Sequence, residues 1–268
     1  MINKKIAIIG VGKMGLAIGL GLLGEDTLSE ENLILSNPSI DKLNVPKHHK
    51  VHLTTSNTDA VRSADIAILA VKPQVIRDVL EEIKHEMQHK LIISIAAGIE
   101  MNTINDILGN DNAVVRVMPN LNAVNNKSMS CWVKNPNVTS EDTKIVKEIL
   151  QVIGKEVELQ KEELIDSATA ISGSGPAYVF YLAELLENEA VRLGLPYDIA
   201  KTLTRQTISG SAFMLDTSLQ SPKDLRLSVT SKGGTTEAAF NQFEKDKLSK
   251  IFYRGINAAF ERAKELHL

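Results

Sequence analysis

The chain has 268 residues, of which 43% are hydrophobic and 24% charged, an ordinary composition for a globular protein. Thirty lysines and arginines against 33 aspartates and glutamates give a net charge of −3 without a basic tail or stripe, which disfavours a nucleic-acid partner. No apolar run reaches the ~18 residues of a membrane span, so we expect no membrane partner. Cys131 is the only cysteine, which excludes an internal disulfide; we expect a small buried side chain in a cytoplasmic protein.

The first half of the chain alternates short apolar runs with segments of helical spacing. Buried strands are predicted at residues 6–9, 33–35, 66–71, 91–95 and 113–117, with helices at 14–23, 75–87 and 101–108. Strand–helix–strand alternation predicts a parallel sheet with right-handed crossovers, which is an α/β fold of the Rossmann type.

The second half is predicted to be helical. One helix is expected at 140–153 with Ser140 as its N-cap, and others at 177–193, 196–215 and 237–266. No convincing strand follows residue 161, and no flexible linker separates the halves. We therefore predict a dinucleotide-binding domain over residues 1–160, followed directly by an all-α domain over 161–268.

A glycine-rich segment joins the first predicted strand to the first predicted helix. It has the GxGxxG spacing in the context of a dinucleotide-binding loop, and its predicted cofactor-binding residues are Gly10, Gly12, Lys13, Met14 and Gly15. Gly10 permits the tight turn, Gly12 lets a pyrophosphate approach the backbone, and Gly15 lets the helix pack on the strand.

The end of the second predicted strand indicates which nicotinamide cofactor binds. An NAD enzyme carries an acidic residue there, which accepts hydrogen bonds from the ribose hydroxyls. Glu30 and Glu31 precede the strand instead, and the residues at its carboxyl end, including Ser36 and Asn37, are uncharged and rich in donors. This end favours a 2′-phosphate and therefore NADPH. NADH stays an alternative, because no arginine is present and Lys42 is the nearest cation.

The segment His85-Glu86-Met87-Gln88-His89 matches the HExxH signature of zinc proteases. A zinc site of that kind needs a third ligand, and the nearby downstream candidate, Glu100, lies across a predicted strand. We expect these histidines to close a surface helix, where they suit the helix dipole, and we expect no metal site.

A second glycine-rich loop lies in the C-terminal third. Thr230-Ser231-Lys232-Gly233-Gly234-Thr235-Thr236 precedes a predicted helix. Backbone N–H groups and the helix dipole converge at such a loop, so it can bind a small anion such as a substrate carboxylate. Two different anion sites in one chain predict an enzyme that binds a nucleotide and a small substrate.

These motifs resemble those of pyrroline-5-carboxylate reductase. The specific segments are Ile171-Ser-Gly-Ser-Gly-Pro-Ala-Tyr178 and Val229-Thr-Ser-Lys-Gly-Gly-Thr-Thr236, and the resemblance extends over nearly the whole chain. It implies a Rossmann domain and a helical dimerisation and substrate domain that interlocks with a partner, giving a homodimer or higher homo-oligomer. The implied activity is NAD(P)H-dependent reduction of L-1-pyrroline-5-carboxylate to L-proline, the last step of proline biosynthesis.

The resemblance also implies roles for individual residues. Asn57 would lie near the adenosine ribose, and the nicotinamide would be bordered by Ala70, Val71, Lys72 and Pro73. The substrate carboxylate would be held by Ser231, Gly233 and Gly234, and Thr235 would also belong to the substrate-binding residues. The hydroxyl of Thr236, the one catalytic candidate, would meet the ring nitrogen while hydride moves to C5 of the cyclic imine.

Several positions depart from the family pattern. Lys232 stands where a proline is usual, and Lys13, Leu121, Leu219 and Ala239-Phe240 also differ. Two alternatives stay open: a related imine or β-hydroxyacid reductase, and a non-catalytic nucleotide-binding member of the family. A hydroxyacid enzyme is expected to carry a lysine in the region 172–193, which has none, and a binding-only protein has no evident need for the second glycine loop.

Overall fold

A computed structural model describes residues 1–24, 27–43, 45 and 50–266. These residues form two compact units. The first unit contains Met1–Ser174 together with the end of the chain from Ala259, and the second contains Gly175–Ala258. The predicted boundary between a dinucleotide-binding domain and a helical domain, at residues 160 and 161, stays a prediction. The two compact units of the structure meet at Ser174.

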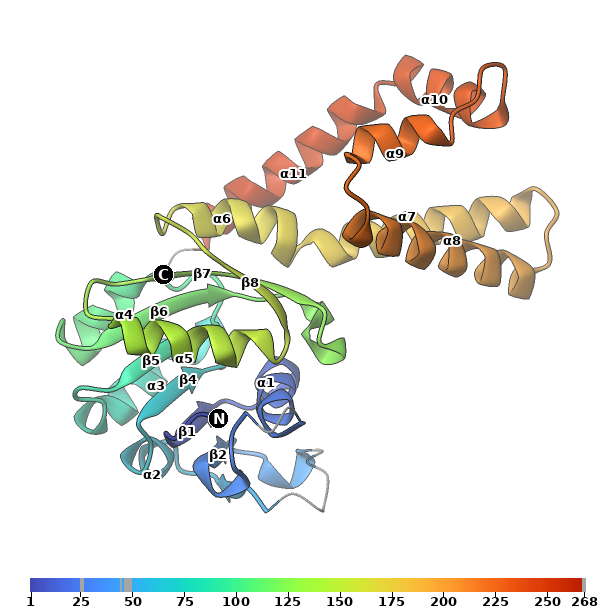
Figure 1. The fold of residues 1–268 in the computed structure, drawn as a ribbon. Coiled ribbons are helices and arrows are strands. Elements are labelled where there is room, and N and C mark those ends of the chain that lie inside the picture. Colours follow the sequence, from blue (N-terminus) through green and yellow to red (C-terminus); the bar gives the residue numbers. More distant parts are fainter. Residues whose placement is uncertain (25–26, 44, 46–49, 267–268) are drawn as a thin grey trace. The chain divides into compact units, whose positions relative to one another are not determined.

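The first unit is built on a sheet with the strand order β3-β2-β1-β4-β5-β6-β7-β8 (Figure 1). The strands are β1 (Ile6–Ile9), β2 (Leu33–Ser36), β3 (His52–Thr54), β4 (Ile66–Leu69), β5 (Leu91–Ser94), β6 (Ala113–Met118), β7 (Ser128–Lys134) and β8 (Gly154–Glu158). The five predicted strands are confirmed. Strands β1 to β6 are parallel, as predicted, and β7 pairs antiparallel with β6 at the edge of the sheet.

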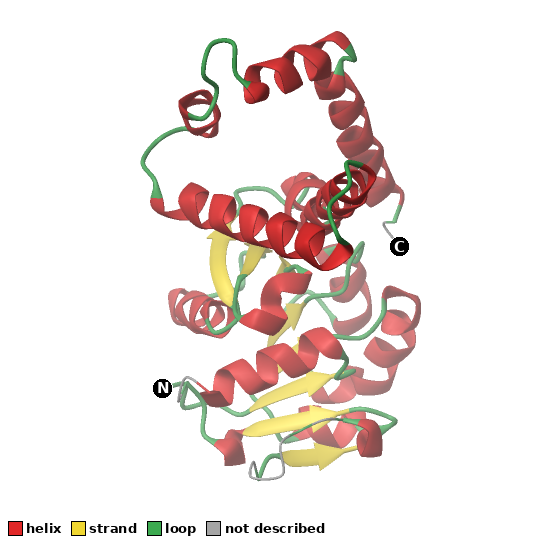
Figure 2. Cartoon of the chain, turned by 90° about the vertical axis from the view of Figure 1, so that its right-hand side faces the viewer, coloured by secondary structure: helices red, strands yellow, loops and turns green. Residues whose placement is uncertain are grey.

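Helices cover both faces of this sheet, as Figure 2 shows. On one face, α1 (Lys13–Gly24) and α5 (Ser140–Gln151) pack on the sheet through apolar side chains such as Leu22 and Ile149. On the other face lie α2 (Asn57–Arg62), α3 (Ile76–Ile83) and α4 (Met101–Leu108). The central strands are apolar along their whole length because both of their faces are covered.

The structure corrects one local prediction and confirms another. The N-cap of α5 is Thr139 rather than Ser140, because Thr139 and Asp142 form a capping box in which each side chain accepts a hydrogen bond from the other's backbone N–H. Cys131 is buried as expected, and burial raises the pKa of its thiol. The thiol therefore stays protonated near neutral pH and is a poor nucleophile.

The described part of the second unit is helical (Figure 2). It contains α7 (Gly175–Arg192), α8 (Tyr197–Thr217), α9 (Pro222–Ser228), α10 (Thr235–Lys245) and the beginning of α11 (Leu248–Glu265). The single helix predicted at 237–266 is divided between α10 and α11, because Lys247 has a left-handed backbone with φ of 57°. Among the described residues, no helix is long and apolar enough to cross a membrane.

The end of α11 belongs to the first unit. Ala263 is buried, and a Cβ atom placed on Gly98 would lie 2.5 Å from the carbonyl oxygen of Leu266. Gly98 also has a φ of 73°, so both its conformation and this close approach require glycine. Leu266, directly after α11, therefore packs against the segment that follows β5.

Candidate active site

The first glycine-rich loop lies between β1 and α1, at the point where the strand order reverses. Strands β2 and β4 both pair with β1, so β1 and β4 border the topological switch point where such sheets bind nucleotides. A Cβ on Gly10 would lie only 2.2 Å from Cγ1 of Val71, which brings the loop against the segment after β4. The structure therefore places two of the predicted cofactor-binding segments in contact.

The other two glycines of the loop have different surroundings. A Cβ on Gly15 would lie 3.2 Å from both Ala70 and Ile8, so this glycine lets α1 approach the sheet closely. A Cβ on Gly12 would meet nothing within 4 Å. Gly12 is therefore not required by packing within the described chain, and the open space beside it suits a bound group.

The N-terminus of α1 has the chemistry of an anion site. The helix begins at Lys13, its first turn contains no acidic residue, and the Lys13 side chain is exposed. The first amides of a helix lack partners within the helix, and those of Lys13, Met14 and Gly15 stand beside the open space at Gly12. These residues fit the pyrophosphate of a dinucleotide.

The two polar residues at the end of β2 bond to other parts of the chain. The Ser36 hydroxyl is buried and donates to Oδ1 of Asn57 at 2.7 Å. Asn37 donates through Nδ2 to the Val11 carbonyl at 2.7 Å and accepts from the Ser39 amide at 2.7 Å. Both side chains therefore hold the glycine-rich loop and Asn57 in place around the predicted ribose site. The side chain of Lys42 lies outside the described residues.

The segment after β4 continues the same edge of the sheet. The Ala70 amide donates to the Ile9 carbonyl at 2.8 Å, and Pro73 opens a short 3₁₀ helix, Pro73–Val75. Val71 is half-buried against Gly10, and Lys72 is exposed. The four residues predicted to border a nicotinamide thus lie beside the glycine-rich loop.

Two polar networks that the sequence did not reveal fix the segment leading out of the first unit. The buried Arg116 of β6 contacts Glu162 at 3.0 Å and Asp166 at 3.7 Å, and Glu162 also accepts from the Met101 amide. These contacts fix the start of α6 (Leu164–Ala168) to the sheet.

The second network lies at the π-helical turn Thr169–Gly173 that follows α6. Asn120 donates through Nδ2 to both oxygens of Ser172, at 3.2 Å to the carbonyl and 3.3 Å to the hydroxyl. π-Helical turns are often found at functional sites. The Ser172 carbonyl and hydroxyl are held by Asn120, two residues beyond β6, at the same sheet edge as the glycine-rich loop.

The second glycine-rich loop forms a tight turn that opens α10 in the second unit. The Gly234 amide donates to the Ser231 carbonyl at 3.0 Å, and Gly233 has a φ of 74°. This is the pattern of a type II turn, with Lys232 at the position where proline is favoured and Gly233 at the position that requires a positive φ. Lys232 therefore preserves the turn while leaving it less constrained.

The amides beyond this turn lie at the N-terminus of α10, where backbone donors can bind an anion. Gly234 is the N-cap and has no side chain to satisfy the first amides, which include those of Thr235 and Thr236. The Gly233 amide instead donates to Oε2 of Glu237 at 2.7 Å. Of the residues predicted to bind the substrate, Gly233 thus has its N–H engaged within the chain, while Ser231 packs on Gly234.

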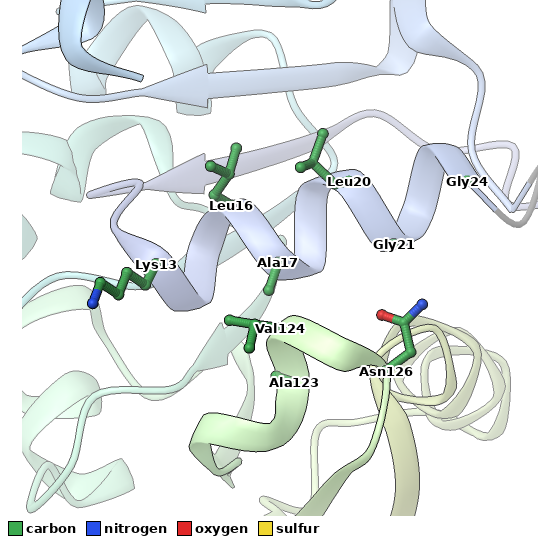
Figure 3. Close-up of a pocket in the computed structure, with 9 residues that line it drawn as sticks. All are labelled: Lys13, Leu16, Ala17, Leu20, Gly21, Gly24, Ala123, Val124 and Asn126. Carbon is green, nitrogen blue, oxygen red and sulfur yellow. The ribbon is translucent and has the colours of Figure 1, made fainter. Parts of the chain in front are cut away.

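A cavity of about 500 Å³ lies along α1 and is lined by residues of that helix from Lys13 to Gly24 and by Ala123, Val124 and Asn126, with Lys13 at one end (Figure 3). Its lining is mostly apolar. Lys13 is the one predicted cofactor residue that reaches it in the described chain.

The HExxH pattern does not lie on an α-helix. Helix α3 ends at Ile83, Lys84–Glu86 is a 3₁₀ turn, and His89 has a left-handed φ of 58°. The two imidazoles therefore do not share the helix face on which the zinc signature depends.

Comparison with known proteins gives two family matches. A model described as pyrroline-5-carboxylate reductase dimerisation matches residues 162–266, and one described as NADP oxidoreductase, coenzyme F420-dependent, matches residues 5–98. The pyrroline-5-carboxylate reductase of Methanosarcina acetivorans is 38% identical over 99% of both chains.

Solved structures agree with these matches over the whole chain. A pyrroline carboxylate reductase of Plasmodium falciparum with NADP bound is 34% identical, covers 100% of both chains and has a TM-score of 0.90. A pyrroline-5-carboxylate reductase of Coxiella burnetii is 35% identical, covers 100% of both chains and has a TM-score of 0.93. A reductive aminase of Aspergillus terreus, at 16% identity and a TM-score of 0.57, shares the fold alone.

The Rossmann sheet, with its glycine-rich loop at the switch point, and the match to an NADP oxidoreductase domain define an oxidoreductase of the nicotinamide-dependent class. The identity of 38% to a curated relative, over 99% of both chains, identifies the family within that class. The chain belongs to the pyrroline-5-carboxylate reductase family.

Proposed function

We propose that this protein reduces L-1-pyrroline-5-carboxylate to L-proline, the last step of proline synthesis. The observation that carries the proposal is the turn at Ser231–Gly234, which opens α10 inside the region matched by the pyrroline-5-carboxylate reductase dimerisation family. The first amides of α10, directly beyond that turn, would offer backbone donors for one carboxylate, with a threonine hydroxyl beside them. The full-length relatives of that name support the same activity.

The residues of the first unit would hold the nicotinamide cofactor. The first amides of α1, at Lys13, Met14 and Gly15, would bind the pyrophosphate in the space left by Gly12, with Gly10 making the turn. Ser36, Asn37 and Asn57 would shape the ribose site, and the nicotinamide would lie along Ala70, Val71, Lys72 and Pro73. The bound cofactor supplies a hydride.

The residues of the second unit would orient the substrate. Ser231, Gly233, Gly234 and Thr235 would surround its carboxylate, and the Thr236 hydroxyl would hydrogen-bond the ring nitrogen and hold the proton that makes the imine a better acceptor. Orienting two bound reactants can contribute about 7–11 kcal/mol at best. No strongly perturbed acid is therefore required.

The proposal includes the setting of the reaction. We expect NADPH as the cofactor, with NADH as an alternative, in a cytoplasmic homo-oligomer. The nucleotide-binding role falls to residues 1–160 and the dimerisation and substrate role to 161–268. The dimerisation family match and the many exposed apolar side chains of α7 and α8 support the oligomer.

Initial rates with pyrroline-5-carboxylate test the proposal, with NADPH and NADH measured in parallel and the product identified by mass. Formation of proline with at least one cofactor is the expected result. Cofactor oxidation only with other cyclic imines would instead indicate a related imine reductase. Cofactor binding without turnover of any cyclic imine would indicate a non-catalytic protein.

A further inference from the structure

An acidic side chain from another element is connected to the end of β2 by hydrogen bonds. Oε2 of Glu82 accepts a hydrogen bond from Nδ2 of Asn57 at 2.8 Å, and Oδ1 of the same asparagine accepts from the Ser36 hydroxyl at 2.7 Å. Ser36 is the last residue of β2. The three side chains form one chain of hydrogen bonds, which leads from the strand end to a carboxylate on α3.

The position of this carboxylate matters because the end of the second strand is where Rossmann proteins distinguish their cofactors. An acidic residue there accepts from the ribose 2′-hydroxyl of NAD, and a cation there accommodates the 2′-phosphate of NADP. The residues of this strand end are uncharged in sequence. Glu82 supplies the acid from α3, the helix that follows β4 rather than β2.

Glu82 forms no ion pair with a cation in the part of the chain that the structure describes. Its neighbour Glu81 contacts Lys84 at 2.6 Å, and Glu86 contacts Arg62 at 3.1 Å. Glu82 is bonded instead to the neutral amide of Asn57. A net negative charge therefore stands one asparagine away from the strand end.

The backbone around Glu82 fixes the carboxylate in this place. The Thr58 hydroxyl donates to the Glu82 carbonyl at 3.3 Å, which ties the start of α2 to α3. Asn57 cannot rotate without losing its bond to Ser36, whose hydroxyl is buried. One Nδ2 hydrogen of Asn57 points to Glu82, and the other stays available to a ligand.

We propose that Glu82 is a specificity-determining residue, which limits the preference for NADPH over NADH by repelling a ribose 2′-phosphate. This inference rests on the proposed nucleotide site at the glycine-rich loop. The donor-rich strand end favours the phosphate, while the uncompensated carboxylate disfavours its two negative charges. The balance between them sets the ratio of the two cofactors.

Two substitutions separate the charge from the hydrogen bond. Glu82→Gln removes the charge and keeps an acceptor for Asn57, whereas Glu82→Ala removes both. We expect both to raise the NADPH/NADH ratio of kcat/KM by about three- to ten-fold, because Glu82 is exposed and its charge is partly screened. Glu81→Gln is the matched control, since it removes a charge from the same helix, and it should leave the ratio unchanged.

Direct binding keeps this test independent of turnover. The dissociation constants of NADPH and NADH, measured by fluorescence titration, should show the same shift, and 0.5 M salt should shrink the difference between wild type and Glu82→Gln. A ratio that stays constant in both variants, or that moves in Glu82→Ala alone, would overturn the charge mechanism. If the wild type binds both nucleotides but makes no proline, the proposed function fails and the binding ratio still decides this inference. If it binds neither, both proposals fall.

Discussion

Gly12 is a residue whose role can be separated from the fold. A Cβ atom placed there would meet nothing within 4 Å, so Gly12→Val should fold normally. It should block the approach of a pyrophosphate to the loop and weaken NADPH binding by at least about ten-fold, which corresponds to 1.4 kcal/mol. Fluorescence titration of NADPH and a thermal unfolding scan measure the two effects.

Gly24→Val is the control for this substitution, because Gly24 lies at the far end of α1 and a Cβ there also meets nothing within 4 Å. It should leave NADPH affinity unchanged. Undiminished affinity in Gly12→Val would show that the glycine-rich loop does not bind the pyrophosphate.

Thr236 is the residue on which the proposed chemistry depends. Thr236→Ala should lower kcat by about 10²-fold, because the hydroxyl that holds the proton at the ring nitrogen is lost. Thr236→Ser keeps a hydroxyl and should retain most of the activity. Steady-state kinetics together with NADPH titration measure this, and equal losses of turnover and cofactor affinity in Thr236→Ala would contradict the role.

The turn that opens α10 makes a prediction at the scale of an element. Lys232 occupies the position of a type II turn that favours proline, and Gly233 already supplies the positive φ. Lys232→Pro should stabilise the turn by about 0.4–1 kcal/mol and slow hydrogen exchange of its amides about two- to five-fold. Amides in α8 serve as the internal reference. Faster exchange would show that Lys232 has a conformation that proline cannot adopt.

The start of α6 depends on a buried cation. Arg116→Met would remove the buried cation that contacts the carboxylates of both Glu162 and Asp166, which should cost about 3–5 kcal/mol in the free energy of unfolding. Urea denaturation measures this cost. Arg262→Ala breaks an exposed pair with Glu265 and should cost less than about 1 kcal/mol. Similar losses in the two variants would mean that burial of Arg116 contributes nothing specific.

The strands that the sequence predicted are those whose composition follows from complete burial. Strands β1 and β4 are continuous apolar runs because both of their faces are covered. The three-residue β3 is exposed, β8 alternates between exposed and half-buried residues, and β7 contains buried serines. Edge strands and strands with polar interiors lack an apolar run, so pattern analysis missed these three.

Only the parts of the candidate site that are contiguous in sequence could be predicted. The glycine-rich loop and the turn before α10 are contiguous motifs with a defined backbone chemistry. Glu82 reaches Asn57 across 25 residues, and Arg116 reaches Glu162 across 46. Such contacts depend on how helices pack on the sheet, and neither charge spacing nor periodicity within one segment encodes that packing.

At the scale of the whole molecule, the second unit has too little core of its own. On α7 the side chains of Phe180, Tyr181 and Leu182 are 55%, 59% and 51% exposed, and Phe213 on α8 is 69% exposed. Monomeric proteins rarely expose apolar surfaces of this extent, whereas the interfaces of obligate dimers resemble a divided core. The helices of this unit are therefore expected to complete their core with a partner subunit.

Leu182→Glu tests the importance of this surface. A buried charge at the interface should convert the oligomer to monomer and abolish proline formation, while NADPH still binds to the first unit. Analytical ultracentrifugation and NADPH titration measure the two outcomes. Lys144→Glu, on the exposed face of α5, is the charge-changing control and should leave the assembly intact. An unaltered oligomer in Leu182→Glu would place the interface elsewhere.

The return of α11 to the first unit has a consequence for how the protein is made. Leu266 packs on Gly98, and Leu266 leaves the ribosome only after all of the second unit has been synthesised. At about 5–20 residues per second, the intervening chain takes on the order of ten seconds. Throughout that interval the nascent sheet lacks this contact beside β5, so the first unit begins to fold early and is completed only by residues translated after the second unit.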